Sequence, residues 1–135
     1  MALEVDITKK LDGFFMHMQF RAEQEIFAIL GASGCGKSMT LKCIAGIEKP
    51  DEGRIVLAGK VLFDSEKKIN LPPQKRKVGY MFQDYALFPH MNIYENIAFG
   101  LKLKKLPKEE IRKKVKHVLA MVDLEGFEDL SLIHI

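Results

Sequence analysis

Eight consecutive residues carry the side chains and the backbone freedom that bind phosphate. They read Gly31-Ala32-Ser33-Gly34-Cys35-Gly36-Lys37-Ser38 and match the pattern G-x-x-x-x-G-K-[ST] at every position. Glycines let the backbone turn tightly, so that successive N–H groups can point at one anion. The ammonium of Lys37 would reach the outer phosphates, and the hydroxyl of Ser38 would bind Mg²⁺. The spacing predicts a polyphosphate-binding loop that ends beside Met39.

The flanking residues have the pattern that would present such a loop. Residues 26–30 are all apolar and of strand length, which predicts a central strand buried on both faces. Residues 39–45 predict a helix, whose positive N-terminal end would face the phosphates. Gly46 is suited to end that helix. A glycine-rich turn without a ligand is the alternative, and the strand and helix around the loop argue against it.

The residues on either side of this unit predict short antiparallel strands. Residues 3–8 alternate apolar and polar, Asp12-Gly13 suits a hairpin turn, and the return strand repeats the alternation. Residues 54–57 and 60–63 form a second predicted hairpin around Ala58-Gly59. Residues 77–82 predict one more strand. The apolar residues of the first return strand would face the core: Phe14, Met16, Met18 and Phe20.

The last third of the chain predicts a helix. Pro107 suits its first turn, and Glu109 and Glu110 complement the helix dipole and pair with lysines four residues later. The many lysines are interpreted as a solvated helix face and not as a nucleic-acid site. One apolar stripe has helical spacing: Ile111, Val115, Val118, Leu119 and Val122.

Length and composition favour one modest soluble domain. The chain has 135 residues, a formal charge of +3 and two cysteines, which gives no argument for a nucleic-acid partner or a disulfide framework. The first residues do not resemble a signal peptide, and no apolar run reaches the length of a membrane span. The cytosol is the expected compartment.

A second motif distinguishes among phosphate-loop proteins. Residues 78–97 read VGYMFQDYALFPHMNIYENI, which closely resembles the Q-loop region of ABC-transporter ATPase subunits, above all those of importers that use a solute-binding protein. The sequences LKCIAG at residues 41–46 and P-x-x-G-x-I at residues 50–55 fit the same family. The resemblance extends from residue 3 to about residue 129.

The resemblance implies an α/β fold: a P-loop NTPase (RecA-like) core with an antiparallel β subdomain and the start of a helical subdomain. It implies ATP and Mg²⁺ as cofactors, held by residues 31–39. Lys37 and Gln83 would be catalytic, and Ser38 and Gln83 would be metal ligands. Residues 85–91 would lie beside the groove that receives a permease helix.

The same resemblance implies the partners and the location. A second ATPase subunit would form a homodimer with this one, transmembrane permease subunits would dock on it, and a solute-binding protein would act indirectly. The subunit would be cytoplasmic and held at the inner face of the membrane by the permease. No nucleic acid is expected.

The sequence differs from the family pattern at the adenine-stacking position, and it does not define the transported substrate. The position at which the family stacks adenine on an aromatic ring is Leu11 here, and neither Phe14 nor Phe15 is assigned that role. The sequence of residues 59–66 and 69–73 looks most like that of molybdate-importer ATPases. Polyamine, sulfate and sugar importers share much of it, so those substrates stay open.

The family pattern stops after Asp129. A signature loop, a Walker B strand with its catalytic glutamate and a switch histidine do not follow, so residues 1–129 are expected to be the N-terminal part of a nucleotide-binding domain. Residues 130–135 read LSLIHI, the translation of the mosaic end of a transposon-based sequencing adapter. We therefore expect a non-native tail, and His134 is not interpreted as the switch histidine.

Three functions follow from these patterns. An importer ATPase subunit is favoured, with this piece alone inactive in hydrolysis and poorly soluble because an apolar strand edge would be unpaired. A soluble ABC protein of DNA repair or ribosome function is disfavoured by the YALFPHM text. A short protein that binds nucleotide without catalysis, or blocks a full-length relative, remains as the third.

Overall fold

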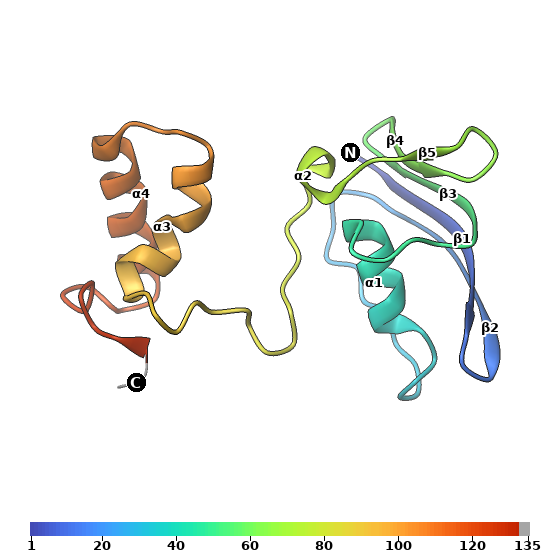
Figure 1. Ribbon diagram of the computed structural model, residues 1–135, viewed down its shortest axis with the longest axis horizontal. Helices are drawn as coiled ribbons and strands as arrows, with labels where there is room; N and C mark the ends of the chain where they lie inside the picture. Colours follow the sequence, from blue (N-terminus) through green and yellow to red (C-terminus); the bar gives the residue numbers. More distant parts are fainter. Residues whose placement is uncertain (133–135) are drawn as a thin grey trace. The chain divides into compact units, whose positions relative to one another are not determined.

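Figure 1 shows the computed structural model of the chain, which describes residues 1–132. The chain divides into two compact units, Met1–Tyr80 and Met81–Ile135. Leu130, Ser131 and Leu132 of the predicted tail belong to the second unit. His134 and its two neighbours lie outside the described residues.

The first unit is built on one antiparallel sheet. Its strands lie in the order β2-β1-β3-β4-β5, and the two predicted hairpins are confirmed by antiparallel pairing of β1 with β2 and of β3 with β4. Both hairpin turns have left-handed backbone, at Gly13 (φ 91°) and at Ala58 and Gly59 (φ 50° and 77°), as tight hairpins require. The elements are β1 (Leu3–Leu11), β2 (Phe14–Ala22), α1 (Lys37–Ala45), β3 (Glu52–Leu57), β4 (Lys60–Asp64), β5 (Ile69–Asn70) and α2 (Pro73–Arg76).

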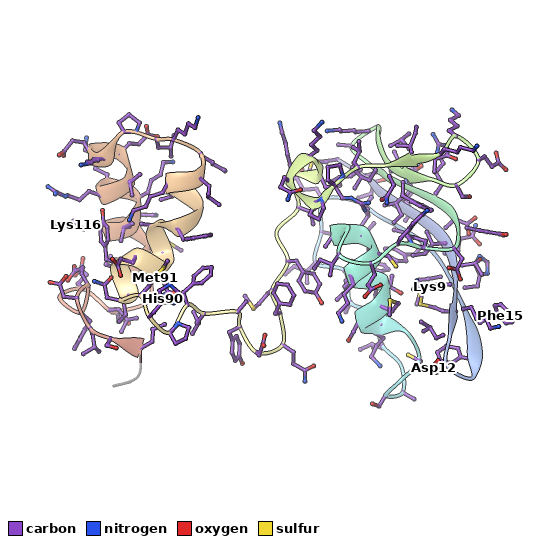
Figure 2. The ribbon with its side chains drawn as sticks, in the orientation of Figure 1. Lys9, Asp12, Phe15, His90, Met91 and Lys116 are labelled. Carbon is purple, nitrogen blue, oxygen red and sulfur yellow. The ribbon has the colours of Figure 1, made fainter. Side chains whose placement is uncertain are left out.

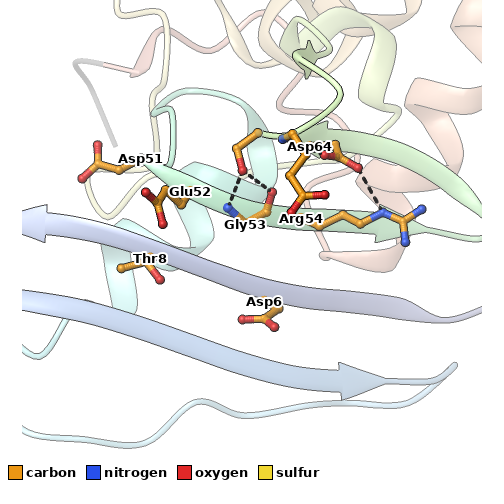
Figure 3. Close-up of a pocket in the computed structure, with 9 residues that line it drawn as sticks. Asp6, Thr8, Asp51, Glu52, Gly53, Arg54 and Asp64 are labelled. Carbon is orange, nitrogen blue, oxygen red and sulfur yellow. Dashed lines mark hydrogen bonds and ion pairs between the residues drawn. The ribbon is translucent and has the colours of Figure 1, made fainter.

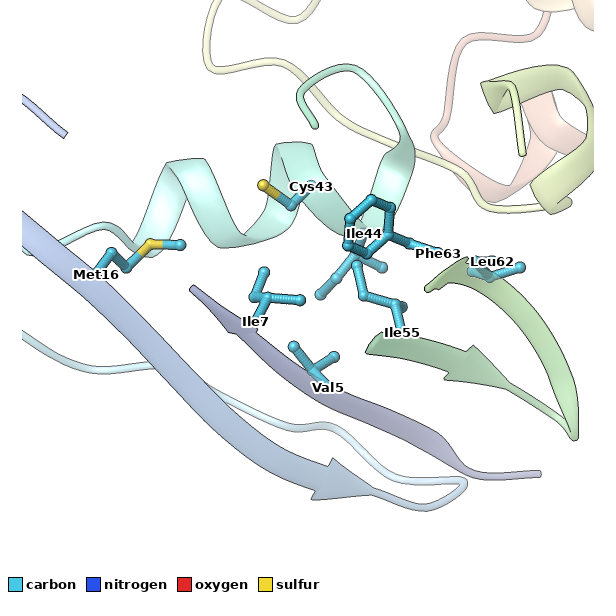
Figure 4. Close-up of a cluster of buried hydrophobic side chains, with 8 residues drawn as sticks. All are labelled: Val5, Ile7, Met16, Cys43, Ile44, Ile55, Leu62 and Phe63. Carbon is cyan, nitrogen blue, oxygen red and sulfur yellow. The ribbon is translucent and has the colours of Figure 1, made fainter. Parts of the chain in front are cut away.

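Helix α1 packs on one face of this sheet and forms the core with it (Figure 4). Alternate residues of β1 point to α1, so Val5 and Ile7 are buried while Asp6 is exposed. On β2, Met16 is buried and Met18 and Phe20 pack at the edge of the core, whereas Phe14 is 39% exposed, so the predicted face is confirmed for three of its four residues. The buried cluster consists of Val5, Ile7, Met16, Cys43, Ile44, Ile55, Leu62 and Phe63.

The predicted buried strand at residues 26–30 is wrong. This segment has no regular secondary structure, and Ile26 and Leu30 are almost fully exposed. A strand is stabilised by ladder hydrogen bonds to a neighbour, and no strand of the described chain pairs with these residues. Phe27 instead stacks on Phe20, with ring centroids 4.9 Å apart.

The predicted strand at residues 77–82 is also wrong. Helix α2 precedes it and ends at Arg76, and the C-cap residue Lys77 has left-handed backbone (φ 56°). Residues 78–82 are irregular, and no strand of the described chain pairs with them. Local propensity, the basis of that prediction, is overridden where a strand finds no neighbour.

The second unit is a pair of helices with its own core. Helix α3 (Ile93–Leu103) packs against α4 (Lys108–Met121), which begins after Pro107 as expected. The predicted stripe is confirmed for three residues, Ile111, Val115 and Leu119, which are buried, whereas Val118 and Val122 are 38% and 55% exposed. No helix of the described residues combines the length and apolar character that a membrane span needs.

Helix α3 was not predicted, although its start carries a sequence signal. The side chain of Asn92 accepts from the Glu95 N–H at 2.8 Å, and the Glu95 carboxylate accepts from the Asn92 N–H at 3.0 Å. This reciprocal pair is a capping box, which satisfies two N–H groups that the first turn leaves open. The spacing N-x-x-E before an apolar run could have located the helix start.

Replacing Asn92 with alanine is expected to destabilise the second unit by about 1 kcal/mol, because the Glu95 N–H loses its cap. Urea unfolding followed by far-UV circular dichroism measures this loss. Lys116→Ala, at an exposed position of α4, is the control and should shift the free energy of unfolding by less than about 0.5 kcal/mol. Equal losses in the two variants would contradict a stabilising cap.

Candidate phosphate-binding site

The predicted phosphate loop lies directly before α1, and two of its glycines have backbone that other residues rarely adopt. Gly34 and Gly36 have φ values of 80° and 98°. A Cβ at Gly36 would lie 2.5 Å from the sulfur of Met16 on β2. The loop therefore touches the sheet at Gly36, and any other residue there would have a strained backbone and would displace the Met16 side chain.

The ammonium of Lys37 folds back over this loop. Its Nζ donates to the carbonyls of Gly31 and Ala32 at 2.6 and 2.7 Å and lies 3.5 Å from the Cys35 sulfur. These acceptors are neutral, so phosphate oxygens, which carry negative charge, would be stronger partners for the same donor. The side chain is thus already positioned at the mouth of the loop.

The first turn of α1 offers further donors. Gly36 is its N-cap and no side chain caps this end, so the N–H groups of Lys37, Ser38 and Met39 lack partners within the helix. The Ser38 side chain is exposed beside them. An ammonium, open amides at a positive helix end and a free hydroxyl fit a Mg²⁺-polyphosphate.

Thr40 is a residue of this site that the sequence did not reveal. It is fully buried, its Oγ1 donates to the Gly36 carbonyl at 2.8 Å, and the Thr40 N–H donates to the same oxygen at 2.8 Å. The Thr40 hydroxyl also lies 3.5 Å from the Met16 sulfur. Thr40 therefore fixes the junction between loop and helix against β2.

A cleft of about 500 Å³ opens beside the first turn of α1. Apolar side chains dominate its walls, and Lys37 and Ser38 lie at one side of it. Part of the segment at residues 26–30 lines it as well. Its lining comprises Leu3, Phe20, Ala22, Glu23, Glu25, Phe27, Ile29, Lys37, Ser38, Leu41 and Ile44.

A larger pocket of about 730 Å³ lies on the opposite face of the sheet and does not suit phosphate (Figure 3). Asp6, Asp51, Glu52 and Asp64 contribute carboxylates to it. One cation faces them, Arg54, whose Nε lies 3.5 Å from the Asp64 carboxylate. The excess of negative charge would repel a nucleotide, so the phosphate loop remains the candidate site.

No aromatic residue of the β1–β2 hairpin is established as an adenine platform. Phe14 and Phe15 are 39% and 72% exposed, and Phe15 carries the Lys10 ammonium 5.9 Å from its ring centroid. Figure 2 shows Phe15 projecting from the sheet near the hairpin end. Leu11 therefore stays at the position where the family stacks adenine, and no aromatic residue of this hairpin is assigned that role instead.

Gln83 and residues 85–91 belong to the second unit, apart from the unit that holds Lys37 and Ser38. Gln83, Tyr85 and Leu87 are exposed. The joint role of Gln83 and Ser38 at a metal ion stays a prediction, because the two side chains lie in separate units.

Asn96, which the sequence did not single out, shapes this exposed loop. Its amide nitrogen donates to the carbonyls of Phe88, Met91 and Asn92, and its Oδ1 accepts from the Phe88 N–H at 2.9 Å. Phe88 also packs on Phe99, with ring centroids 4.5 Å apart. His90 and Met91, labelled in Figure 2, lie within this ordered turn.

The chain is similar in sequence to proteins of one known family. Residues 16–134 match the protein family described as ABC transporter. A "Spermidine/putrescine import ATP-binding protein PotA" of Clostridioides difficile (strain 630) is 53% identical over 118 residues, which are 87% of this chain and 31% of that protein. The protein of the same name from Clostridium acetobutylicum is 50% identical over 113 residues, which are 83% of this chain and 30% of that protein. The chain spans about a third of the length of these curated relatives.

Two solved structures share the fold. The dimeric post-hydrolysis structure of the ATP-binding cassette MJ0796 bound to ADP and Pi has a TM-score of 0.73 at 25% sequence identity. The match covers 100% of this chain and 63% of the MJ0796 chain. The structure of cbiO1 from Clostridium perfringens, part of the transporter complex cbiONQ, has a TM-score of 0.71 at 31% sequence identity. The match covers 96% of this chain and 53% of that chain. These likenesses confirm the predicted fold class, a P-loop fold with an antiparallel sheet and the start of a helical subdomain.

The two cysteines of α1 and its loop differ in environment. Cys35 is half-buried in the loop, and Cys43 is fully buried in the core. Burial raises the pKa of the Cys43 thiol from 9.0 to about 11, with a smaller opposing effect of Lys9. The thiolate of Cys43 is therefore excluded from the folded state at neutral pH.

The raised pKa of Cys43 predicts a loss of stability in alkali. The folded state holds the thiol proton more tightly than the unfolded state, so its contribution is complete below pH 9.0 and is lost as pH rises through about 11. Two pKa units correspond to about 2–3 kcal/mol.

Urea unfolding at about pH 8 and about pH 10.5 tests this in the wild type and in Cys43→Ala, which cannot titrate there. The wild type should lose more stability over this interval than the variant. Parallel losses would show that Cys43 does not titrate with folding.

Proposed function

The chain belongs to the ABC transporter family, and on that basis we propose that it forms the phosphate-binding half of the ATP site of an importer's ATPase subunit. The observation that carries this proposal is the loop at residues 31–38. There the Lys37 ammonium and the uncapped first turn of α1 meet at one point. No carboxylate of the described residues is bonded to Lys37, so its charge is free to pair with phosphate.

Each residue has a chemical task in this proposal. The amides of residues 34–39 bind phosphate oxygens, and Lys37 exchanges the carbonyls of Gly31 and Ala32 for the outer phosphates. Ser38 would supply one oxygen ligand to Mg²⁺, and Gln83 is kept, as the family resemblance implies, as the second proposed ligand through its amide oxygen. The Mg²⁺ ion, when bound, neutralises charge on the phosphates during transfer. This chain alone is expected not to hydrolyse ATP, because its residues include no assigned general base.

The partners proposed are a second copy of the subunit and transmembrane permease subunits, with a solute-binding protein acting through the permease. Two observations support them: the curated relatives are named import ATP-binding proteins, and a structural neighbour is a dimer. The exposed Tyr85 and Leu87 beside the turn that Asn96 holds would serve as the permease-facing surface. In this proposal the permease would hold the subunit at the inner face of the membrane.

Polyamine is the proposed substrate class. Both curated relatives carry spermidine and putrescine in their names, which supports the polyamine alternative and gives no support to molybdate. ATPase assays with the complete transporter and its binding protein would distinguish polyamine from molybdate. ATP turnover stimulated by spermidine-loaded binding protein, and unaffected by molybdate, is the expected result.

Residues 1–129 are proposed to be native and residues 130–135 to be translated adapter. Resequencing the locus by a transposon-free method tests this, and a stop codon directly after Ile135 would exclude it. A genuine short protein that binds nucleotide without catalysis is the alternative that such a stop codon would favour.

Mg-ATP is expected to protect Cys35 from alkylation, because the loop closes over the phosphates beside its sulfur. Lys37→Ala should raise the ATP concentration for half-protection about thirtyfold, since a charge-assisted hydrogen bond contributes about 2 kcal/mol. Peptide mass spectrometry separates Cys35 from Cys43. Protection is compared with and without nucleotide in each variant.

Lys75→Ala, at an exposed position of α2, is the matched control and should leave half-protection unchanged. Wild-type Cys35 alkylated equally fast with and without Mg-ATP would overturn the proposed nucleotide site.

A further inference from the structure

One arginine of the first unit is buried without an anionic partner. Arg76, the last residue of α2, is 2% exposed. Its guanidinium donates to two carbonyls at the end of α1, Cys43 at 2.8 Å and Ile44 at 3.1 Å. It also donates to the Leu71 carbonyl at 2.7 Å and to Asn70 Oδ1 at 2.8 Å.

All four acceptors are neutral, so the charge must be stabilised in another way. The last carbonyls of a helix carry the negative end of its dipole, and a cation there is favourable. Burial lowers the pKa of Arg76, with an opposing contribution from Cys43, yet a guanidinium remains charged in proteins. The C-terminal end of α1 therefore takes the place of a counter-ion.

The neighbouring backbone is shaped around this guanidinium. Gly46 ends α1 in the left-handed conformation (φ 82°), and its N–H bonds back to the Cys43 carbonyl at 3.3 Å. A Cβ at Gly46 would lie 2.6 Å from Arg76 Nε. The glycine that ends the helix thus also makes room for the arginine.

The opposite end of the same helix carries the phosphate loop. Helix α1 has nine residues, and its two ends are held by different contacts: Gly36 and Thr40 against Met16 at the loop, and Arg76 at the far end. A short helix moves as a rigid body, so a shift at one end displaces the other. Arg76 also fixes the segment at residues 70–71 to α1.

We propose that Arg76 is a positioning residue for the phosphate loop, acting through α1 on the amides and Lys37 that bind nucleotide. This inference rests on the proposed nucleotide site. It assigns to Arg76 no contact with the nucleotide. Lysine cannot replace it fully, because an ammonium lacks the planar fork that reaches the α1 carbonyls, Leu71 and Asn70 together.

Half-protection of Cys35 by Mg-ATP, measured in the whole chain, tests the proposal. Arg76→Met should raise the required Mg-ATP concentration about tenfold, the size of effect expected when a group that orients binding residues is lost. Arg76→Lys should recover part of the loss. Arg112→Met, at a 70% exposed side chain of α4, is the matched exchange and should change nothing.

A second control separates positioning from stability. Val56→Ala shortens a buried side chain of β3 that lies outside the cluster packed on α1, and it lowers the free energy of unfolding. At equal fraction folded, a merely structural role predicts that Cys35 is protected alike in Arg76→Met and Val56→Ala. The proposal predicts that only Arg76→Met loses protection.

The outcomes distinguish the two proposals. If wild-type Cys35 shows no protection, both the nucleotide site and the role of Arg76 are overturned. If the wild type is protected and Arg76→Met is protected equally well, only the role of Arg76 is overturned. Should Arg76→Met fail to fold, Asn70→Ala removes its one side-chain acceptor and must weaken protection for the proposal to stand.

Discussion

The fixed position of helix α1 is the constraint on which the site depends. Its N-terminal turn must present open amides to an anion, which leaves that end without a cap and without intrinsic stability. The compensation comes from elsewhere. Thr40 and Gly36 hold the loop junction against Met16 of β2, Cys43 and Ile44 bury one side of the helix in the sheet core, and Arg76 binds the far end. Tertiary contacts therefore stabilise α1, whose N-terminal end has no side-chain cap of its own.

The Lys37 ammonium can change its hydrogen-bond partners when an anion enters the loop. Lys37 donates to the Gly31 and Ala32 carbonyls, neutral acceptors that a charged phosphate can replace. The acidic pocket on the opposite face of the sheet keeps its carboxylates away from this point, with Asp64 bound to Arg54 and to the backbone of residues 66 and 67. The Lys37 ammonium thus lies at the loop, and a group of carboxylates lies behind the sheet.

The second unit uses polar contacts to hold an exposed apolar loop. Asn96 bonds both the N–H and the carbonyl of Phe88, and the capping box of Asn92 and Glu95 starts the helix directly behind it. Docking of exposed side chains such as Tyr85 and Leu87 costs less backbone entropy where the backbone is already ordered. Such order suits a surface that a partner is proposed to recognise.

The sequence by itself determined the features that depend on neighbouring residues. The glycine-rich turn before α1, the two hairpins, most of the core face of β2, the glycine that ends α1 and three residues of the apolar stripe of α4 were predicted, because turn chemistry and periodicity act over a few positions. Only the tertiary structure decided the rest. Residues 26–30 and 77–82 were predicted as strands yet form none, since a strand needs a hydrogen-bonded neighbour, and local sequence does not supply one. Arg76, Thr40 and Asn96 likewise gain their roles from acceptors that folding brings to them, and no spacing in the sequence announces such a partner.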